Sequence, residues 1–176
     1  MVTRFSVFKT EVKGKMKVSI LFVCLGNICR SPAAEGAFTK LVQEKGLTDQ
    51  FIIDSCGTGD WHIGELAHPN TRKVAQSNGI QLTHRARQIS SKDLEKFDYV
   101  LAMDDSNINN VLRLAKTEDL KQKVIKFRKF DPLYKNEPDV PDPFHGTEKD
   151  FIEVQEIVTR TSESLLEFLI TKYKLG

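Results

Sequence analysis

Cys24 and Arg30 are separated by five residues in the segment Cys24-Leu-Gly-Asn-Ile-Cys-Arg-Ser31, and together they could carry out phosphoryl chemistry. A cysteine thiolate is a strong nucleophile, and a guanidinium group presents a planar fork that matches two oxygens of a phosphate. Gly26 allows backbone torsions that other residues resist. The pattern therefore indicates attack by Cys24 on a phosphorus atom held by Arg30, followed by hydrolysis of the cysteinyl phosphate.

The neighbouring sequence places this segment between a strand and a helix. Lys17–Val23 is short, apolar and β-branched, which is typical of a buried strand. Pro32 is expected at the first position of a helix that Gly46 ends, because a proline lacks only an N–H that has no partner there. Free N–H groups and the helix dipole at such an N-terminus attract anions and favour a thiolate. We therefore expect this loop to bind phosphate.

The rest of the chain alternates between strand and helix patterns. We expect strands at 51–55, 98–103 and 123–127, helices at 69–78 and 104–116, a short turn at 92–97 capped by Ser91, and a last helix after a capping box at Thr147 and Asp150. This alternation predicts an α/β fold in three layers, with a four-stranded parallel sheet between helices. Ligands of such folds bind beyond the carboxyl ends of the strands, where the loop at 24–31 lies.

The composition predicts one soluble domain. The chain has 176 residues and a mass of 20.0 kDa, with 40% hydrophobic and 28% charged residues. Its 26 basic and 24 acidic residues are too balanced for a nucleic-acid-binding protein, and no apolar run is long enough to span a membrane. Residues 1–15 fit the rest poorly. We expect them to be a dispensable extension of a single domain at 16–176.

The cysteine content argues against a disulfide framework and a structural zinc site. Cys24, Cys29 and Cys56 are odd in number and few, and no downstream Cys/His pair accompanies them. A reducing, cytoplasmic setting is therefore expected, without a metal or a cofactor. Cys56 is expected in the core, and surface or loop positions are expected for His62, His68 and His145.

The segment VCLGNICRSP resembles the signature of the low-molecular-weight protein tyrosine phosphatases. The resemblance runs from Met16 to about Tyr173. It includes the segments 55–58, 84–89, 97–100, 103–107 and 142–144, together with Trp61. It implies a flavodoxin-like fold and a monomer that hydrolyses phosphotyrosine and small aryl phosphate monoesters. Phosphotyrosine-containing proteins would be the substrates, and inorganic phosphate or similar oxyanions would compete with them.

The resemblance also implies a role for each catalytic residue. Cys24 is the nucleophile and Arg30 binds the phosphoryl oxygens. The family takes its general acid from an Asp-Pro-aromatic segment before the last helix, which corresponds to Asp142-Pro143-Phe144. Asp131-Pro132 in the same loop lacks the aromatic residue and is interpreted as a turn initiator.

Further implied positions bind the substrate or support the site. The substrate-binding positions are Leu25, Gly26, Asn27, Ile28, Cys29, Trp61 and Phe144, the last two as walls of a slot for the phenyl ring. The supporting network comprises Asn27, Ser31, His84 and Asp104. Cys29 is implied to pair reversibly with Cys24 under peroxide, with a small buried side chain as the alternative. Phe144-His145-Gly146 departs from the aromatic pair common in the family, which leaves the peptide preference open.

Two other functions are compatible with parts of this pattern. An arsenate reductase of the same fold relays electrons through two downstream cysteines, and this chain has no cysteine after Cys56. A phosphotyrosine-binding module without catalysis typically lacks the nucleophile or the acid, whereas Cys24, Arg30 and Asp142 are all present here. A hydrolysis assay separates the binding module from the enzyme.

Overall fold

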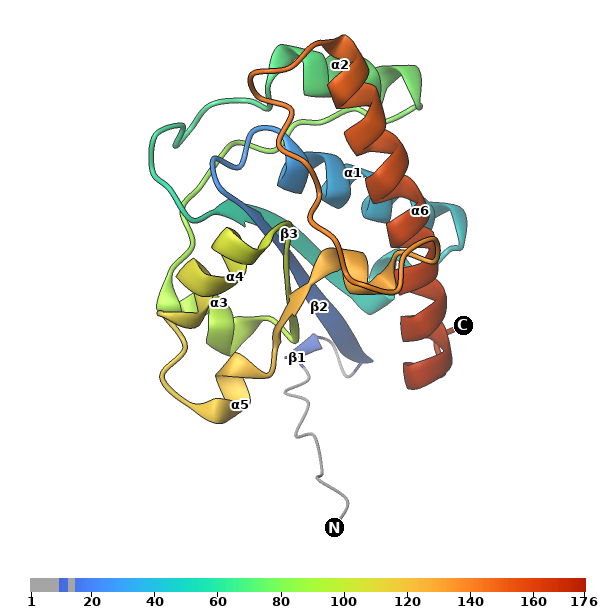
Figure 1. Ribbon diagram of the computed structural model, residues 1–176. Helices are drawn as coiled ribbons and strands as arrows, with labels where there is room; N and C mark the ends of the chain where they lie inside the picture. Colours follow the sequence, from blue (N-terminus) through green and yellow to red (C-terminus); the bar gives the residue numbers. More distant parts are fainter. Residues whose placement is uncertain (1–9, 13–14) are drawn as a thin grey trace.

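A computed structural model describes residues 10–12 and 15–176, in which strands and helices alternate (Figure 1). The strands are β1 Thr10–Val12, β2 Lys15–Cys24, β3 Phe51–Gly57, β4 Tyr99–Ala102 and β5 Val124–Lys126. The α-helices are α1 Arg30–Glu44, α2 Pro69–Ser77, α3 Ser91–Lys96, α4 Asp105–Leu112, α5 Glu118–Lys121 and α6 Glu148–Tyr173. Short 3-10 turns occupy η1 Thr48–Gln50 and η2 Phe127–Phe130.

The central sheet has four parallel strands in the order β3-β2-β4-β5, which confirms the predicted α/β fold. In its register, Val18 lies opposite Phe51 and Cys24 lies opposite Gly57. Strand β1 adds an antiparallel pairing to the start of β2. The predicted extension at 1–15 thus contributes one short strand, while residues 1–9 and 13–14 of it lie outside the described part.

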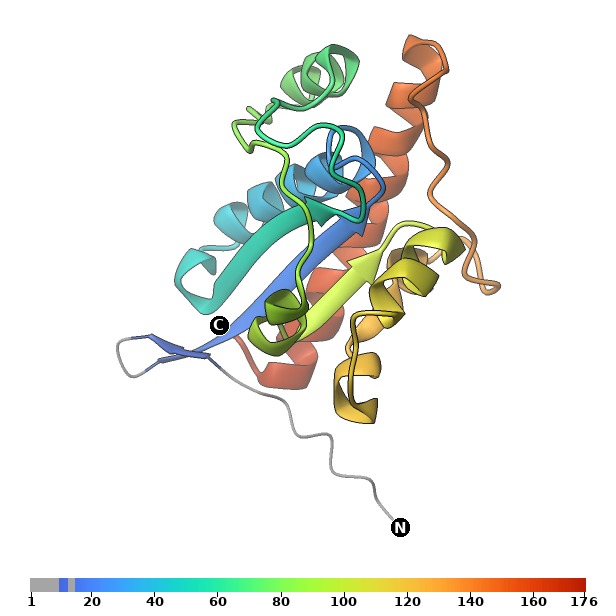
Figure 2. The same cartoon turned by 90° about the vertical axis from the view of Figure 1, so that its left-hand side faces the viewer.

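Helices cover both faces of the sheet (Figures 1 and 2). Successive side chains of each strand point to opposite faces, so apolar residues are available on both. Ile20 and Phe22 of β2 pack in the core formed with α1 and α6, which lie together on one face. Leu21 and Val23 pack in a second core with residues of α3 and α4 on the other face. The carboxyl end of β2, where the candidate loop begins, therefore lies at one edge of three packed layers.

Helix boundaries differ from the sequence prediction where capping decides them. Helix α1 begins at Arg30, so Pro32 is its third residue; this is tolerated because N–H groups of the first turn lack helical partners. Helix α3 is capped by Ser90 in a capping box with Asp93, rather than by Ser91. Asp104 is the N-cap of α4, not its first residue. The four-residue helix α5 was not predicted.

The last helix follows the predicted pattern closely. Thr147 and Asp150 form the expected capping box. Its apolar residues Phe151, Val154, Val158, Leu165 and Leu169 are buried, whereas Phe168 is exposed and packs against Phe130. Across the described residues, no helix combines the length and the apolar character needed to cross a bilayer.

Candidate active site

The loop between β2 and α1 is held against the end of β3. The carbonyl groups of Cys24 and Leu25 accept hydrogen bonds from the N–H groups of Thr58 and Gly59, each at 2.9 Å. A Cβ atom at Gly57 would lie 2.7 Å from the carbonyl oxygen of Leu25, so only glycine permits this close approach. The end of β3 therefore fixes the backbone of the loop.

Asn27 is the centre of the hydrogen-bond network beneath the loop. Its φ angle is 54°, in the left-handed region that asparagine tolerates better than most residues. Its amide nitrogen donates to the hydroxyl groups of Ser31 and Ser55, at 2.8 and 2.9 Å. Its oxygen accepts from His84 Nε2 at 2.9 Å and from the backbone N–H of Arg87 at 3.0 Å. The buried Asn27 side chain thus ties the loop to the start of α1, to β3 and to the segment 84–87.

Cys24 and Ser31 are the buried pair at the centre of the site. Their side-chain atoms Sγ and Oγ lie 3.0 Å apart. Asn27 donates to the Ser31 oxygen, so the hydroxyl proton can point toward the sulfur or toward the carbonyl oxygen of Cys56, which lies 3.4 Å away. Ser31 can therefore donate a hydrogen bond to a thiolate on Cys24.

Arg30 is buried at the start of α1 and contacts two carboxylates. Its Nη1 donates to Asp104 Oδ2 at 2.6 Å and to the carbonyl oxygen of Val140 at 3.2 Å. Its Nη2 lies 3.5 Å from Asp142 Oδ2. Burial opposes the charge, but Cys24 and the two carboxylates raise the pKa of Arg30 overall, so the guanidinium stays charged.

The segment before α6 carries Asp142 to the mouth of the site. Asp142 is partly exposed, and its Oδ1 accepts from the N–H of Phe144 at 3.2 Å. A cavity of about 270 Å³ opens there, and it is lined by Cys24, Leu25, Gly26, Ile28, Cys29, Arg30, Trp61, His62, Asp142, Phe144 and His145. The side chains expected to act on a phosphate and on a phenyl ring thus share one cavity.

The structure separates the expected residues into two groups. Asn27, Ser31, His84 and Asp104 do not line the cavity; they hold its residues through the hydrogen bonds described above. His62 and His145 do line it, although their sequence suggested only surface or loop positions. For His145 a signal existed, because it directly follows the Asp-Pro-aromatic segment. His68 caps α2 and stacks on Phe151, as a structural residue would.

Asp131 lies outside the cavity, in a buried ion pair. Its carboxylate accepts from Arg128 at 2.9 Å and from Arg160 at 3.0 Å. Burial works against its charge, but these partners and the N–H of Leu133 hold its pKa below the usual range. Its carbonyl group also closes a turn with Tyr134, at 3.3 Å, as a turn initiator would. Arg128 lies three residues before Asp131, but Arg160 could not be found from the sequence, because it is 29 residues away.

The thiols of the other two cysteines, Cys29 and Cys56, are poor nucleophiles at neutral pH. Burial, together with the nearby Cys24, raises the pKa of Cys29 to about 12. Burial also raises the pKa of Cys56 well above its ordinary value, and Cys56 is fully enclosed in the core, as predicted. Both side chains therefore stay protonated near pH 7.

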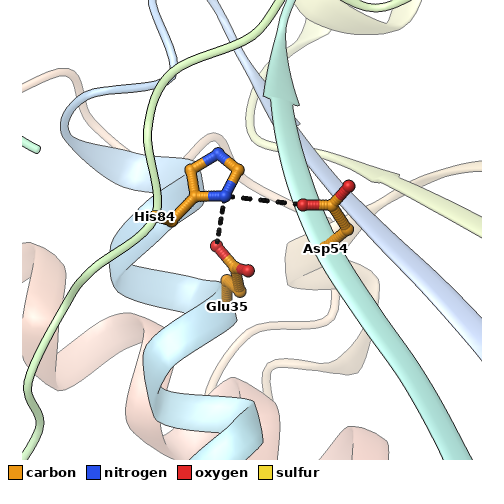
Figure 3. A group of neighbouring side chains, drawn as sticks. All are labelled: Glu35, Asp54 and His84. Carbon is orange, nitrogen blue, oxygen red and sulfur yellow. Dashed lines mark ion pairs between the residues drawn. The ribbon is translucent and has the colours of Figure 1, made fainter. Parts of the chain in front are cut away.

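Glu35, Asp54 and His84 form a cluster (Figure 3), and His84 joins it to Asn27. His84 Nδ1 lies 3.5 Å from Asp54 and 3.7 Å from Glu35, and Ser55 donates to Glu35 at 2.7 Å. Burial raises the pKa of Glu35 to about 7, whereas burial lowers the pKa of His84. Sequence analysis missed Glu35; its one signal was a carboxylate one helical turn after Ser31.

The comparisons with known proteins agree with this geometry. Residues 19–175 match the family model described as low molecular weight phosphotyrosine protein phosphatase. The protein of that name from Sus scrofa is 37% identical over 150 residues, covering 85% of this chain and 94% of the pig protein. The one from Schizosaccharomyces pombe is 45% identical over 130 residues, covering 73% and 82%.

Solved structures show the same fold. A protein tyrosine phosphatase from Entamoeba histolytica, crystallised with Hepes in the active site, superposes with a TM-score of 0.84 at 41% identity, over 90% of this chain and all of that one. YfkJ from Bacillus subtilis superposes with a TM-score of 0.82 at 37% identity, over 89% and 96%. The similarity therefore extends over nearly the whole domain.

Proposed function

The chain belongs to the low molecular weight phosphotyrosine protein phosphatase family, and from this membership we propose that it hydrolyses phosphotyrosine in proteins through a cysteinyl-phosphate intermediate. The observation that carries the proposal is that Cys24, Arg30 and Asp142 line one cavity. Arg30 forms an ion pair with Asp142, and the negative charges of Cys24 and Asp142 raise the pKa of Arg30. A nucleophile, an anion-binding group and a proton donor are the parts that such a reaction needs.

In the first step, the Cys24 thiolate attacks phosphorus and the bond from phosphorus to the phenolic oxygen breaks. Arg30 and the N–H groups of residues 25–30 hold the phosphoryl oxygens, which carry the negative charge. Protonated Asp142 gives its proton to the leaving oxygen, so tyrosine departs as a neutral phenol.

In the second step, water attacks the phosphorus of the intermediate. The Asp142 carboxylate takes a proton from this water, and the sulfur–phosphorus bond breaks. Cys24 leaves as a thiolate that accepts the hydrogen bond of Ser31, whose oxygen lies 3.0 Å away. Inorganic phosphate is released, and the two half-reactions return every group to its starting state.

The walls of the cavity support a preference for aryl phosphates. Trp61 and Phe144 both line it and both remain partly exposed, so a phenyl ring between them would bury apolar area on each side. A phosphoserine side chain has no ring to make these contacts.

We propose the following setting for the reaction. Inorganic phosphate and similar oxyanions compete with the substrate for Arg30; Hepes, found in the active site of the Entamoeba protein, carries such a group. The three cysteines are free, which suits a reducing cytoplasm.

The enzyme acts as a monomer, and residues 16–176 suffice, because the family match begins at residue 19. Deleting residues 1–15 should leave kcat and the melting temperature unchanged; loss of either contradicts this.

The decisive experiment compares wild type with Cys24→Ser in the hydrolysis of p-nitrophenyl phosphate, in mildly acidic buffer with excess chelator. We expect turnover in the wild type and none in the variant, which should still bind phosphate. Substantial turnover by Cys24→Ser would show that another group is the nucleophile. A folded wild type without turnover would instead favour the phosphotyrosine-binding module.

A further inference from the structure

Gly59 contacts the indole of Trp61, although Gly59 itself does not line the catalytic cavity. A Cβ atom on Gly59 would overlap the six-membered ring of that indole at Cε3 and Cζ3, and would lie 3.0 Å from Cη2. The indole therefore occupies the space that any side chain at position 59 would need.

The backbone at Gly59 does not itself require glycine. Its φ angle lies outside the left-handed region, in contrast to that of Gly64 in the same loop, which is 86°. Residues with a side chain can therefore adopt the backbone conformation of position 59. The missing side chain of Gly59 thus serves the position of the Trp61 indole rather than the course of the chain.

The segment before Trp61 is held by hydrogen bonds to its neighbours. The N–H groups of Thr58 and Gly59 donate to the carbonyl groups of Cys24 and Leu25, each at 2.9 Å. The carbonyl group of Thr58 also accepts from Gln88 Nε2 at 3.2 Å. The backbone at position 59 therefore cannot retreat to make room for a side chain.

The segment after Trp61 is held as well. The N–H of Gly64 donates to the carbonyl group of Ala86, and the N–H of Ala86 donates to that of Glu65, each at 2.8 Å. The side chain of Glu65 pairs with His62 Nδ1, also at 2.8 Å. Because the chain is fixed on both sides of residue 61, only its indole can yield to a larger residue at position 59.

The Trp61 side chain has room to move, because it is 67% exposed. Trp61 lines the cavity and Gly59 does not, so the indole stands between Gly59 and the cavity. A methyl group at position 59 would therefore push the indole off the backbone toward the cavity, where Phe144 is the proposed opposite wall. This displacement would narrow the space between the two aromatic walls.

We propose that Gly59 is a positioning residue that sets the width of the aryl slot, because its missing side chain lets the Trp61 indole lie back against the chain. The inference rests on the proposed function, since it takes the space between Trp61 and Phe144 as the site of the aryl group. Gly59 acts through Trp61 and does not touch the substrate. It thereby determines which aryl phosphates the slot admits, while Arg30 binds the phosphoryl group independently of it.

The experiment measures binding to the full chain, so that it does not depend on turnover. Calorimetry gives the affinities of inorganic phosphate, phenylphosphonate and 2-naphthylphosphonate for the wild type and for Gly59→Ala. We expect Gly59→Ala to weaken 2-naphthylphosphonate about tenfold, as a change of one methyl group does in a close apolar pocket, and to weaken the narrower phenylphosphonate less. The affinity for inorganic phosphate should stay unchanged, because phosphate has no ring.

A double-mutant cycle with Trp61→Ala tests whether Gly59 acts through the indole. In the Trp61→Ala background no indole meets residue 59, so adding Gly59→Ala should change the ratio of the two phosphonate affinities by less than about twofold. Asp60→Asn is the matched control: it alters the exposed side chain next to Gly59 and should leave this ratio at its wild-type value.

Trp61 is the only tryptophan of the chain, so tryptophan fluorescence reports on this indole alone. Without ligand, the emission of Gly59→Ala should differ from that of the wild type, with circular dichroism showing that both are folded. An equal loss of affinity for all three ligands, an unchanged affinity ratio, or the same change of ratio in the Trp61→Ala background would overturn the proposal. A wild type that binds the phosphonates as expected but hydrolyses no aryl phosphate would contradict the proposed function and leave the role of Gly59 intact.

Discussion

At the scale of single residues, the Asp142 side chain must contact two different groups, one in the free protein and one during the proposed reaction. In the structure its carboxylate lies 3.5 Å from Arg30, and in the proposed reaction it must reach the leaving oxygen. A dianionic phosphate is a stronger partner for Arg30 than one carboxylate is. Substrate binding is therefore expected to release Asp142 from the arginine and free it to donate its proton.

Asp142→Ala should slow substrates according to their leaving groups. A general acid contributes about 10²–10⁴ in rate, and the contribution is largest where the leaving oxygen is most basic. We expect a loss of about 10² or more for phenyl phosphate and a much smaller one for 2,4-dinitrophenyl phosphate. The control is Asp119→Ala, on the exposed face of α5. Equal losses across the series would show that Asp142 is not the acid.

Sequence analysis could find the residues of the catalytic cavity because they lie in short motifs. Cys24, Arg30 and Asp142 each stand in a recognisable local pattern. Glu35 and Arg160, which pairs with Asp131, do not, because their contacts join segments far apart in the chain. Local patterns show which side chains can react, but only the packed structure shows which ones hold them in place.

At the scale of elements, the segment that carries Asp142 is fixed at several points before it reaches the site. Lys126 of β5 contacts Asp139 at 2.6 Å and Asp105 at 2.8 Å. Arg128 donates to the carbonyl group of Asp139 at 2.7 Å. The N–H of Val140 donates to Met103 at 2.7 Å, which joins the segment to the end of β4. The long loop between η2 and α6 is therefore anchored to the sheet.

Lys126→Met should loosen this anchor while keeping the apolar stem of the side chain. Partly exposed ion pairs contribute about 1 kcal/mol, so we expect roughly a fivefold loss of kcat. The loss should be larger for basic leaving groups, because Asp142 is the group displaced. Lys121→Met is the matched control, since it breaks the exposed pair with Glu118 on α5. An unchanged leaving-group dependence in Lys126→Met would contradict this anchoring role.

The elements themselves were predictable to different degrees. The long periodic pattern of α6 and the short apolar run of β2 were both found with nearly correct ends. Helix α5 was missed because four residues show no period, and the prediction placed the cap of α3 on Ser91 instead of the adjacent Ser90. The side chain of Asp93, three residues after Ser90, decides between them.

At the scale of the whole molecule, Glu35 makes stability depend on pH. Its pKa is raised from 4.5 to about 7 in the folded chain. Between these values the folded protein keeps a proton that the unfolded chain releases, so stability falls as the pH rises and is level above about pH 7. The shift corresponds to about 3 kcal/mol at most.

Glu35→Gln should remove this part of the pH dependence. The free energy of unfolding in urea, measured with chelator at pH 5 and pH 8, should fall less in the variant than in the wild type. Glu153→Gln, an exposed change on α6, should keep the wild-type dependence. The same decrease in Glu35→Gln as in the wild type would mean that another group causes it.

Asn27 also limits how far this sequence can vary. Its side chain uses two donors and two acceptor positions at once, on a backbone in the left-handed region. Aspartate has no donors to offer, glutamine reaches one methylene further, and glycine keeps the torsion but loses every bond. No other residue supplies these four hydrogen bonds on this backbone, so substitution of Asn27 is expected to disrupt the catalytic loop although its side chain does not line the cavity.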